Sequence, residues 1–319
     1  MSTSKSSFVD VVTRYLAQRR ALGFDLRIAG KRLLVFARFA DQHAQGGPLT
    51  IALALAWAHA TSRPSQLTSA RRLEIVRPFA QWLRQLDPRT EVPPARLLGR
   101  AHRRLVPHIY THDELRALLA EADRLTPPGG LRPASLVALL GLLASTGMRV
   151  SEALALRRSD VDLEAGLLHV RQTKFRKSRL VPLHPTTVTA LRSYAALCDR
   201  PAPGHARDDA FFVVDGGIRL SYSKVRTAFR RIRIRLGWEE GSGRRPRIHD
   251  LRHTFACQRL LLWQEQRADV SRCLLDLCTY LGHAKVSDTY WYLSAFPELL
   301  ELSAKRFEEF ASARGEVRS

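Results

Sequence analysis

The chain has 319 residues, and 45% of them are hydrophobic, so it can bury a sizeable core and is not a disordered polymer. Its 51 Lys and Arg residues outnumber the 30 Asp and Glu residues, and the formal net charge of +21 favours a polyanion as partner. The opening residues and the four cysteines fit neither a secretion signal nor a disulfide scaffold, and no apolar run is long enough to span a bilayer. We therefore expect a soluble cytoplasmic protein.

The first 90 residues are expected to form a helical N-terminal domain. Apolar residues recur at helical spacing in segments 8–16, 33–40, 50–60 and 73–86, and the links between these segments are short. This pattern is typical of a small helical bundle.

Residues 91–106 are expected to link this domain to a second one. The surrounding stretch, 87–108, contains several prolines, has no helical period and carries a basic cluster of Arg100, Arg103 and Arg104. A basic linker can follow a phosphate backbone, and a merely solvated connector explains the same charge equally well.

Residues 107–319 are expected to form a mainly α domain with one small antiparallel β-sheet. Thr111 and Glu114 make a capping box ahead of a periodic helix. The segment 166–183 has two β-branched runs around a basic turn, which predicts a β-hairpin. The other expected elements are helices at 133–146, 186–198 and 221–236, a strand at 211–214, and helices from Ile248 onward.

Two basic stretches could each contact a phosphate. Arg149 lies between apolar neighbours in TGMRVSEALAL, near a helix start, where an arginine either anchors carbonyls and carboxylates or binds an anion. Lys174, Arg176 and Lys177 lie in the hairpin turn, where positive charge is usually only solvated. Neither stretch decides the function by itself.

The stretch RIHDLRHTFA, residues 247–256, combines histidine with arginine. His249 and Arg252 are three residues apart and so share a helix face. His249 and His253 also have the spacing of the zinc-binding HExxH helix, but Asp250 replaces its glutamate and Arg252 would crowd a cation. A zinc hydrolase is therefore the weaker hypothesis.

The stretch YLGHAKVSDTYWYL, residues 280–293, contains three tyrosines. Gly282 is expected to end one helix and Ser287 to cap the next, which leaves His283 in the turn. Tyr290 and Tyr292 lie about 200° apart around a helix, so only one of them can face a given pocket. A lone tyrosine is usually a packed aromatic residue.

Together these residues suit phosphoryl transfer without a metal or another cofactor. The sequence has no carboxylate cluster for a metal and no glycine-rich nucleotide loop. Two arginines could instead stabilise the charge on the phosphate oxygens. A strongly cationic pocket would also favour the phenolate of a tyrosine, whose pKa is ordinarily about 10.

These stretches resemble, in order, the motifs of the tyrosine recombinases (phage integrase family). TGMRVSEALAL resembles the first arginine box, TKFRKSRLVPL the β-hairpin with its lysine, HDLRHTFA the His-x-x-Arg box, and LGH followed by a later tyrosine the C-terminal box. The resemblance covers residues 107–300. It implies the catalytic residues Arg149, Lys174, His249, Arg252, His283 and Tyr292.

The resemblance also implies the roles of these residues and the architecture around them. Tyr292 would be the nucleophile, and Lys174 would protonate the 5′-oxygen leaving group. Residues 1–90 would be the core-binding (SAM-like) domain, and residues 294–310 resemble the family's C-terminal helix, which docks on a neighbouring protomer. The apolar residues of this segment favour such docking, and packing on their own protomer is the alternative. Tyr280 and Tyr290 are expected to be packing residues.

A site-specific recombinase of this kind would act on double-stranded DNA in the nucleoid, as a homotetramer and in some systems with sister recombinases. It would pass through a 3′-phosphotyrosyl intermediate and a Holliday junction. The phrase DTYWYLSAFPELL resembles transposon-encoded recombinases and favours mobile-element integration over a Xer-type chromosome or plasmid resolvase. A type IB topoisomerase, a telomere resolvase and a DNA-binding protein that has lost catalysis are further alternatives.

The expected helix at 221–236 has two distinct faces. Apolar residues at helical spacing predict a core stripe on one face. Three arginines share another face: Arg226, Arg230 and Arg233. They can enter the major groove or contact phosphates, and a solvated basic face explains them equally well.

Overall fold

The computed structural model describes residues 7–44, 46–62, 65–101, 106–171, 178–199, 209–239, 245–266 and 268–282. The chain divides into two compact units, residues 1–105 and 106–319. Among the helices in the described ranges, none is long and apolar enough to cross a membrane.

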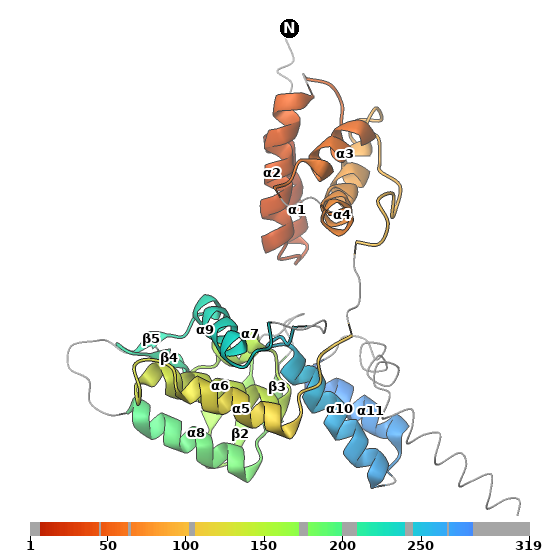
Figure 1. Cartoon of the computed structure of the whole chain (residues 1–319). Coiled ribbons are helices and arrows are strands. Elements are labelled where there is room, and N and C mark those ends of the chain that lie inside the picture. The colour runs from red at the N-terminus through yellow and green to blue at the C-terminus, as the bar shows by residue number, and fades with distance from the viewer. Residues whose placement is uncertain are drawn as a thin grey trace, which may run out of the picture. The chain divides into compact units, whose positions relative to one another are not determined.

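The N-terminal unit is a bundle of four helices around an aromatic core (Figure 1). The helices are α1 (Phe8–Ala21), α2 (Arg27–His43), α3 (Ile51–His59) and α4 (Gln66–Arg84). Ser7, Thr50 and Ser65 cap α1, α3 and α4, each accepting a backbone N–H of the first turn. In the core, Phe36 packs against Trp57 and Phe79 with ring centroids 5.2 and 6.5 Å away.

Residues 91–101, which the sequence predicts to be linker, lie along the N-terminal unit. Arg77 Nε donates to the Pro93 carbonyl at 3.1 Å, and Arg71 Nε donates to the Ala101 carbonyl at 3.0 Å. Val92 and Leu98 pack against the aromatic core. This segment lacks a helical period, and two arginines of α4 donate hydrogen bonds to two of its backbone carbonyls.

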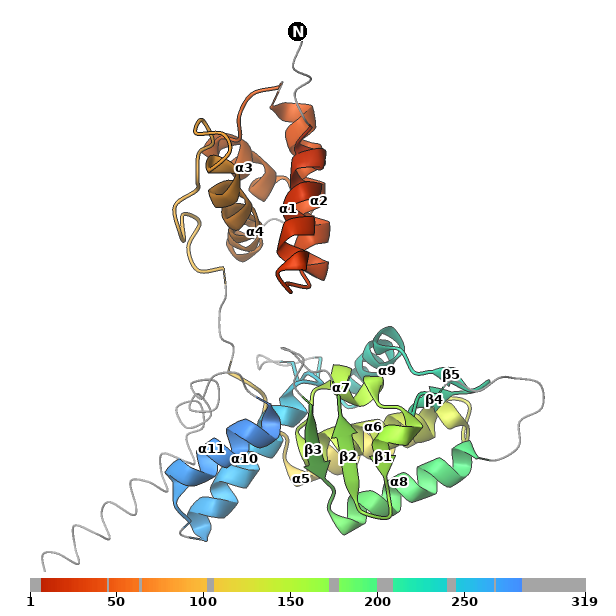
Figure 2. The same cartoon turned by 180° about the vertical axis from the view of Figure 1, so that it is seen from behind.

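The C-terminal unit is built around α6 (Leu131–Thr146), which α5 (His112–Asp123), α8 (Pro185–Cys198) and α10 (Asp250–Glu265) contact (Figures 1 and 2). Because α6 is apolar on nearly all sides, it can be buried on all sides. Its buried leucines are Leu136, Leu139, Leu140, Leu142 and Leu143. The capping box predicted at Thr111 and Glu114 is present at the start of α5.

A three-stranded antiparallel sheet lies in the same unit (Figure 2). Its strands are β1 (Val161–Asp162), β2 (Leu167–Val170) and β3 (Arg179–Pro182), in that order. In the β2–β3 ladder Leu168 pairs with Val181 and Val170 pairs with Arg179. The predicted hairpin strands are therefore confirmed, whereas the basic turn between them, residues 172–177, lies outside the described residues.

A second sheet consists of β4 (Val213–Val214) and β5 (Ile218–Arg219). The sequence predicts one strand at 211–214 and neither β1 nor β5, because two-residue strands are too short to show an alternating pattern. The mainly helical architecture is confirmed, but the described residues form two small antiparallel sheets where the sequence predicts one.

Four further elements belong to the C-terminal unit. They are α7 (Val150–Ala155), the 3₁₀ helix η1 (Arg158–Asp160), α9 (Tyr222–Arg235) and α11 (Val270–Leu281). Helices α10 and α11 pack on one another around a small apolar cluster of their own. At its edge Tyr280 stacks on Phe255 with ring centroids 5.6 Å apart.

Candidate active site

The site begins at the sharp turn between α6 and α7. Gly147 ends α6 with φ +62°, a left-handed conformation that glycine adopts without strain. A Cβ built on Gly147 would lie 2.9 Å from Cγ of Phe255, so the turn has no room for a side chain. The chain then reverses, and Arg149 stands at the N-cap of α7. Its predicted place at a helix start is confirmed.

Arg149 holds two acceptors and remains partly open to solvent. Its Nη1 donates to Oε1 of Glu152 at 2.8 Å, and its Nη2 donates to the carbonyl of Gly282 at 3.2 Å. The side chain is 29% exposed, whereas that of Glu152 is 7% exposed. Arg149 is thus an anchor for a carboxylate and a carbonyl, and its open edge can still accept an anion.

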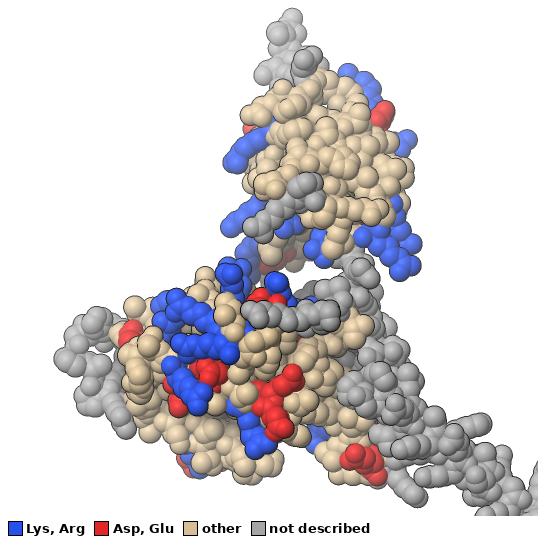
Figure 3. Space-filling view, in the orientation of Figure 1, with Lys and Arg blue, Asp and Glu red and all other residues tan. Residues whose placement is uncertain are grey.

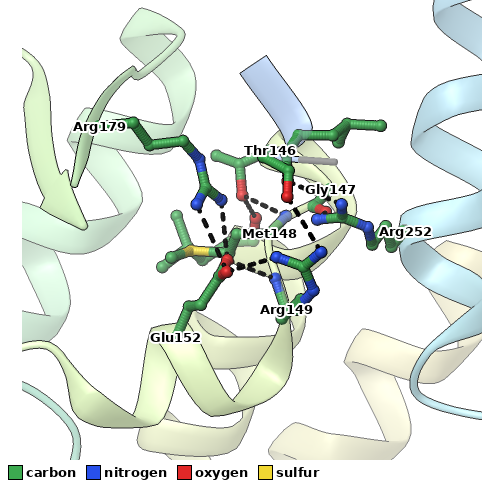
Figure 4. A network of polar contacts seen from close by, with 10 residues as sticks. Thr146, Gly147, Met148, Arg149, Glu152, Arg179 and Arg252 are labelled. Atoms are coloured by element: carbon green, nitrogen blue, oxygen red, sulfur yellow. Dashed lines mark hydrogen bonds and ion pairs between the residues drawn. The ribbon is translucent and has the colours of Figure 1, made fainter. Parts of the chain in front are cut away.

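Arg252 supports the same region from α10 and is almost completely buried. It is 2% exposed, and it donates to the Gly147 carbonyl at 2.9 Å and to the Leu281 carbonyl at 2.7 Å. Figure 4 shows the two guanidinium groups meeting at the turn that follows α6. Gly282, with φ +68°, ends α11, as the sequence predicts. Both arginines therefore reach the backbone immediately before His283.

Glu152 also binds a third arginine, Arg179, at the start of β3 (Figure 4). Arg179 Nη2 donates to Oε2 at 2.7 Å and Nη1 donates to Oε1 at 3.3 Å. Burial by itself would raise the pKa of Glu152, but the hydrogen bonds and charge of Arg179, followed by the hydrogen bonds of Arg149, lower it overall. The carboxylate is therefore ionised at neutral pH.

His249 lies immediately before α10, within the electrostatic range of both arginines. Desolvation by the surrounding protein lowers the pKa of His249, although the residue keeps an exposed surface. The charges of Arg252, Arg247 and Arg149 lower this pKa further, and the carboxylate of Asp250 opposes them. The ring is edge-on to His253, with centroids 4.8 Å apart. A neutral imidazole near pH 7 can accept a proton.

The zinc hypothesis loses its general base in the structure. Asp250 is fully buried, and its carboxylate accepts hydrogen bonds from the Arg247 side chain at 2.6 to 3.2 Å and from the Arg247 backbone at 2.8 Å. Within the described ranges, no group of three His, Cys, Asp or Glu residues could hold a metal ion. Asp250 is thus a structural ligand of Arg247.

The structure brings together Arg149, His249 and Arg252. The other predicted catalytic residues, Lys174, His283 and Tyr292, lie outside the described residues, as do Arg103, Arg104, Arg176, Lys177 and the tail 294–310. Their neighbours are described: β2 and β3 flank the segment that contains Lys174, and Gly282 directly precedes His283. Tyr280 packs on Phe255, and burial raises its pKa to about 12.

The basic residues predicted to contact DNA differ in their surroundings. Arg100, Arg226 and Arg230 are exposed. Arg233 instead donates to the Pro246 carbonyl at 2.9 Å and pairs with Oε1 of Glu239 at 2.7 Å. Figure 3 shows Lys and Arg side chains gathered over the part of the C-terminal unit that carries α9, with acidic side chains close by.

The sequence interpretation missed the roles of Glu152 and Arg179. A signal was present for Glu152, because an acid three residues after the N-cap position is typical of a capping box. The contact of Glu152 with Arg179 joins residues 27 positions apart, so no local pattern indicates it. The carbonyls of Gly147 and Leu281 cannot be identified as acceptors from the sequence, because every residue has a carbonyl. Only the folded chain reveals these acceptors.

The C-terminal unit of this two-unit chain is mainly helical and gathers Arg149, His249 and Arg252, a basic group that suits a phosphate. Residues 109–298 match the model of the phage integrase family. The chain belongs to this family, the tyrosine-type site-specific recombinases.

Two relatives span most of the chain. "Putative integrase/recombinase y4rB" of Sinorhizobium fredii is 38% identical over 95% of this chain and 98% of the relative. Tyrosine recombinase XerC of Chlamydia trachomatis serovar L2 is 32% identical over 72% of this chain and 67% of the relative. The sequence alone therefore relates this chain both to integrases and to Xer-type enzymes.

Solved structures have the same fold. The integrase of transposon Tn1549 bound to transposon right end DNA has a TM-score of 0.66, with 15% identity, and the match covers 94% of this chain and 99% of that one. XerH bound to its palindromic difH substrate has a TM-score of 0.63, with 20% identity, and the match covers 88% and 79%.

Proposed function

We propose that this recombinase cuts and rejoins double-stranded DNA through a 3′-phosphotyrosyl bond to Tyr292. The observation that carries the proposal is the convergence of Arg149 and Arg252 on the carbonyls of Gly282 and Leu281, where α11 ends and directly before His283. Two guanidinium groups beside a histidine form a site for a phosphodiester whose non-bridging oxygens gain charge during displacement.

Each predicted catalytic residue has a role in the displacement at the scissile phosphorus. The Tyr292 oxygen attacks phosphorus, and the neutral imidazole of His249 accepts the phenol proton. As the bond to the 5′-oxygen breaks, Lys174 donates a proton to that oxygen. Arg149 and His283 stabilise the phosphate oxygens by direct contact, and the buried Arg252 adds its positive charge and holds the turn beneath them. Neither a metal ion nor ATP enters this reaction.

Rejoining uses the energy kept in the phosphotyrosyl bond. The free 5′-hydroxyl of one strand attacks the phosphotyrosine of the partner strand and releases Tyr292. Two such exchanges pass through a Holliday junction and need four active subunits, so we propose a homotetramer on synapsed DNA, built from this chain with or without sister recombinases. The tail 294–310 would then join neighbouring protomers.

We propose that the N-terminal unit is the core-binding domain and that basic residues of both units track the DNA backbone. Of the three arginines predicted on α9, Arg226 and Arg230 are available for phosphate or base contact, because they are exposed. Arg233 belongs instead to the pairing with Glu239. Arg100, Arg103, Arg104, Arg176 and Lys177 would add phosphate contacts from the linker and hairpin.

Mobile-element integration is the proposed biological role. The support is the relative of S. fredii, which carries an integrase/recombinase name and matches 95% of this chain, compared with 72% for XerC. A Xer-type resolvase is the second candidate because its chemistry is the same. Neighbouring sister recombinase genes or inverted repeats flanking this gene would favour the mobile element.

A nicked-duplex assay tests the chemistry. DNA flanking the gene is nicked beside each candidate site, so that a short fragment diffuses away after cleavage and the covalent complex accumulates. Wild type, Tyr292→Phe, Tyr290→Phe and Tyr280→Phe are compared on denaturing gels with a metal chelator present. We expect an adduct with every protein except Tyr292→Phe.

The other outcomes separate the alternatives. Loss of the adduct only in Tyr290→Phe would move the nucleophile by two positions. A wild-type adduct that forms in a parallel reaction without chelator, but not in its presence, would contradict a metal-free reaction. Tight binding to the flanking DNA without any adduct would support a DNA-binding protein that has lost catalysis.

A further inference from the structure

Arg179, at the start of β3, contacts two other segments of the site. It holds both oxygens of Glu152 on α7, at 2.7 and 3.3 Å. A Cβ built on Gly282 would lie 3.0 Å from its Nη1, so the guanidinium also rests against the end of α11. Its side chain is 13% exposed, less than half the exposure of Arg149. A single side chain thus joins the hairpin strand, the first arginine box and the last turn before His283.

This contact changes the charge that Arg149 presents. Glu152 Oε1 accepts from Arg149 Nη1 at 2.8 Å and from Arg179 Nη1 at 3.3 Å, so one carboxylate serves two guanidinium groups. Without Arg179, the negative charge of Glu152 would pair with Arg149 alone. Because Glu152 is 7% exposed, water screens that pairing weakly and it would largely cancel the charge of Arg149.

We propose that Arg179 is a positioning residue of the strand-cleavage reaction, which shares Glu152 so that Arg149 stays oriented and its positive charge remains available to the scissile phosphate. This inference rests on the proposed function. Arg179 acts through Glu152 and Arg149, and it does not itself need to touch the DNA.

The chain offers a matched control for a general loss of an ion pair. Arg192 on α8 also holds a glutamate, Glu164, at 3.2 Å, and it donates to the Leu163 carbonyl at 2.8 Å. In that pair the two side chains are 50% and 93% exposed, and neither belongs to the site. Arg192→Gln is therefore expected to form the covalent adduct at the wild-type rate.

A double-mutant cycle on the nicked duplex gives the first test. We expect Arg179→Gln to slow adduct formation about a hundredfold, because a small misplacement of a catalytic group has an effect of this size. Adding Glu152→Gln removes the carboxylate that would cancel the charge of Arg149. The double variant should therefore form the adduct about tenfold faster than Arg179→Gln. A double variant as slow as Arg179→Gln, or slower, would show a purely architectural role and overturn the proposal.

Arg179→Lys covers the case in which Arg179→Gln does not fold. Lysine keeps the positive charge beside Glu152 but supplies fewer fixed donors. We expect a rate within about tenfold of wild type. A loss of about a hundredfold or more in a folded Arg179→Lys protein would mean that charge sharing is not the reason for the effect.

Orthovanadate binding provides a readout that needs no strand cleavage. Vanadate imitates the five-coordinate phosphorus of the displacement, and calorimetry on the full chain measures its affinity. The signal lost in Arg149→Gln defines binding at the site. We expect Arg179→Gln to weaken that component about tenfold and the double variant to restore it; an unchanged affinity in Arg179→Gln overturns the inference. If wild type formed no adduct, the proposed chemistry would fail, but this arm would still decide the role of Arg179.

Discussion

Arg149 and Arg252 hold consecutive carbonyls of the same turn from two different helices: Arg252 donates to Leu281 at 2.7 Å and Arg149 donates to Gly282 at 3.2 Å. The pair fixes the chain path immediately before His283 without using a carboxylate there. The two arginines differ in burial, since Arg252 is 2% exposed whereas the Arg149 side chain is 29% exposed. This difference separates their expected contributions to stability and to catalysis.

Arg252→Gln should destabilise the protein, whereas Arg149→Gln should chiefly affect the reaction. Removing Arg252 leaves the buried carbonyls of Gly147 and Leu281 without these donors, which costs about 2–5 kcal/mol of unfolding free energy. Arg149→Gln should change it by less than about 1 kcal/mol, because Glu152 keeps Arg179, but should slow adduct formation at least about a hundredfold. Urea unfolding and the nicked-duplex assay measure the two effects. Equal destabilisation by both variants would contradict this assignment.

Gly147→Ala should be strongly destabilising. The residue has φ +62°, and an added Cβ would lie 2.9 Å from Cγ of Phe255, so strain and overpacking together should cost about 2–4 kcal/mol. Gly141→Ala in α6 is the matched control, because nothing lies within 4 Å of its Cβ position. Since alanine favours a helix over glycine, this variant should gain about 0.5–1 kcal/mol of unfolding free energy. Urea midpoints measure both changes, and a tolerated Gly147→Ala would mean that the turn is not constrained as described.

The rate of adduct formation should fall in mildly acidic solution. His249 has a pKa below its ordinary value of about 6.5, so the folded protein carries the neutral imidazole at pH 7 and protonates it only at lower pH. The rate should therefore be level above about pH 6.5 and decline as the pH falls through the folded pKa. Folding stability should decline from about pH 6.5 down to the folded pKa and then become level, because the unfolded chain binds the proton first.

Single-turnover rates between pH 5 and 8, on the wild type and on His249→Gln, measure the effect. The acid-side decline assigned to His249 should be absent from the variant, which should be slow at every pH. A wild-type decline that persists unchanged in His249→Gln would assign the titration to another group.

The arginines of α9 should divide into DNA contacts and a structural pair. Arg226→Gln and Arg230→Gln should each weaken DNA binding and lower the slope of log affinity against log salt by about 1. Arg233→Gln should leave the salt slope unchanged and lower stability, because it breaks the pairing with Glu239 and the bond to Pro246. Fluorescence anisotropy at several salt concentrations measures the slopes. A reduced slope in Arg233→Gln would place that residue on the DNA.

The elements that the sequence predicts best are those with a long periodic pattern or a strong local signal. The apolar stripes of α1, α4 and α9 and the Thr111–Glu114 capping box each depend on residues close together in the chain. Strands β1 and β5 have two residues each and no period to detect. Residues 91–101 have a loop-like sequence, and their packing on α4 depends on arginines that lie 16 and 30 positions away.

Sequence motifs could identify the side chains of the site, but they could not reveal the backbone carbonyls that accept hydrogen bonds from its arginines. Arg149, His249 and Arg252 could be chosen from their boxes, and the structure places them around one turn. That Arg252 is a nearly buried carbonyl ligand, and that Arg233 pairs with Glu239, follows from tertiary contacts that no local pattern contains.

The carbonyls that receive Arg149 and Arg252 have a consequence for how the protein can evolve. A side-chain acceptor disappears with one codon change, whereas a peptide carbonyl is supplied by every amino acid. At positions 147, 281 and 282 these contacts therefore depend on the path of the main chain, which the positive φ angles of the two glycines and the burial of Leu281 maintain, and not on acceptor chemistry. Substitutions around the turn that preserve this path should leave the two guanidinium groups with the same ligands.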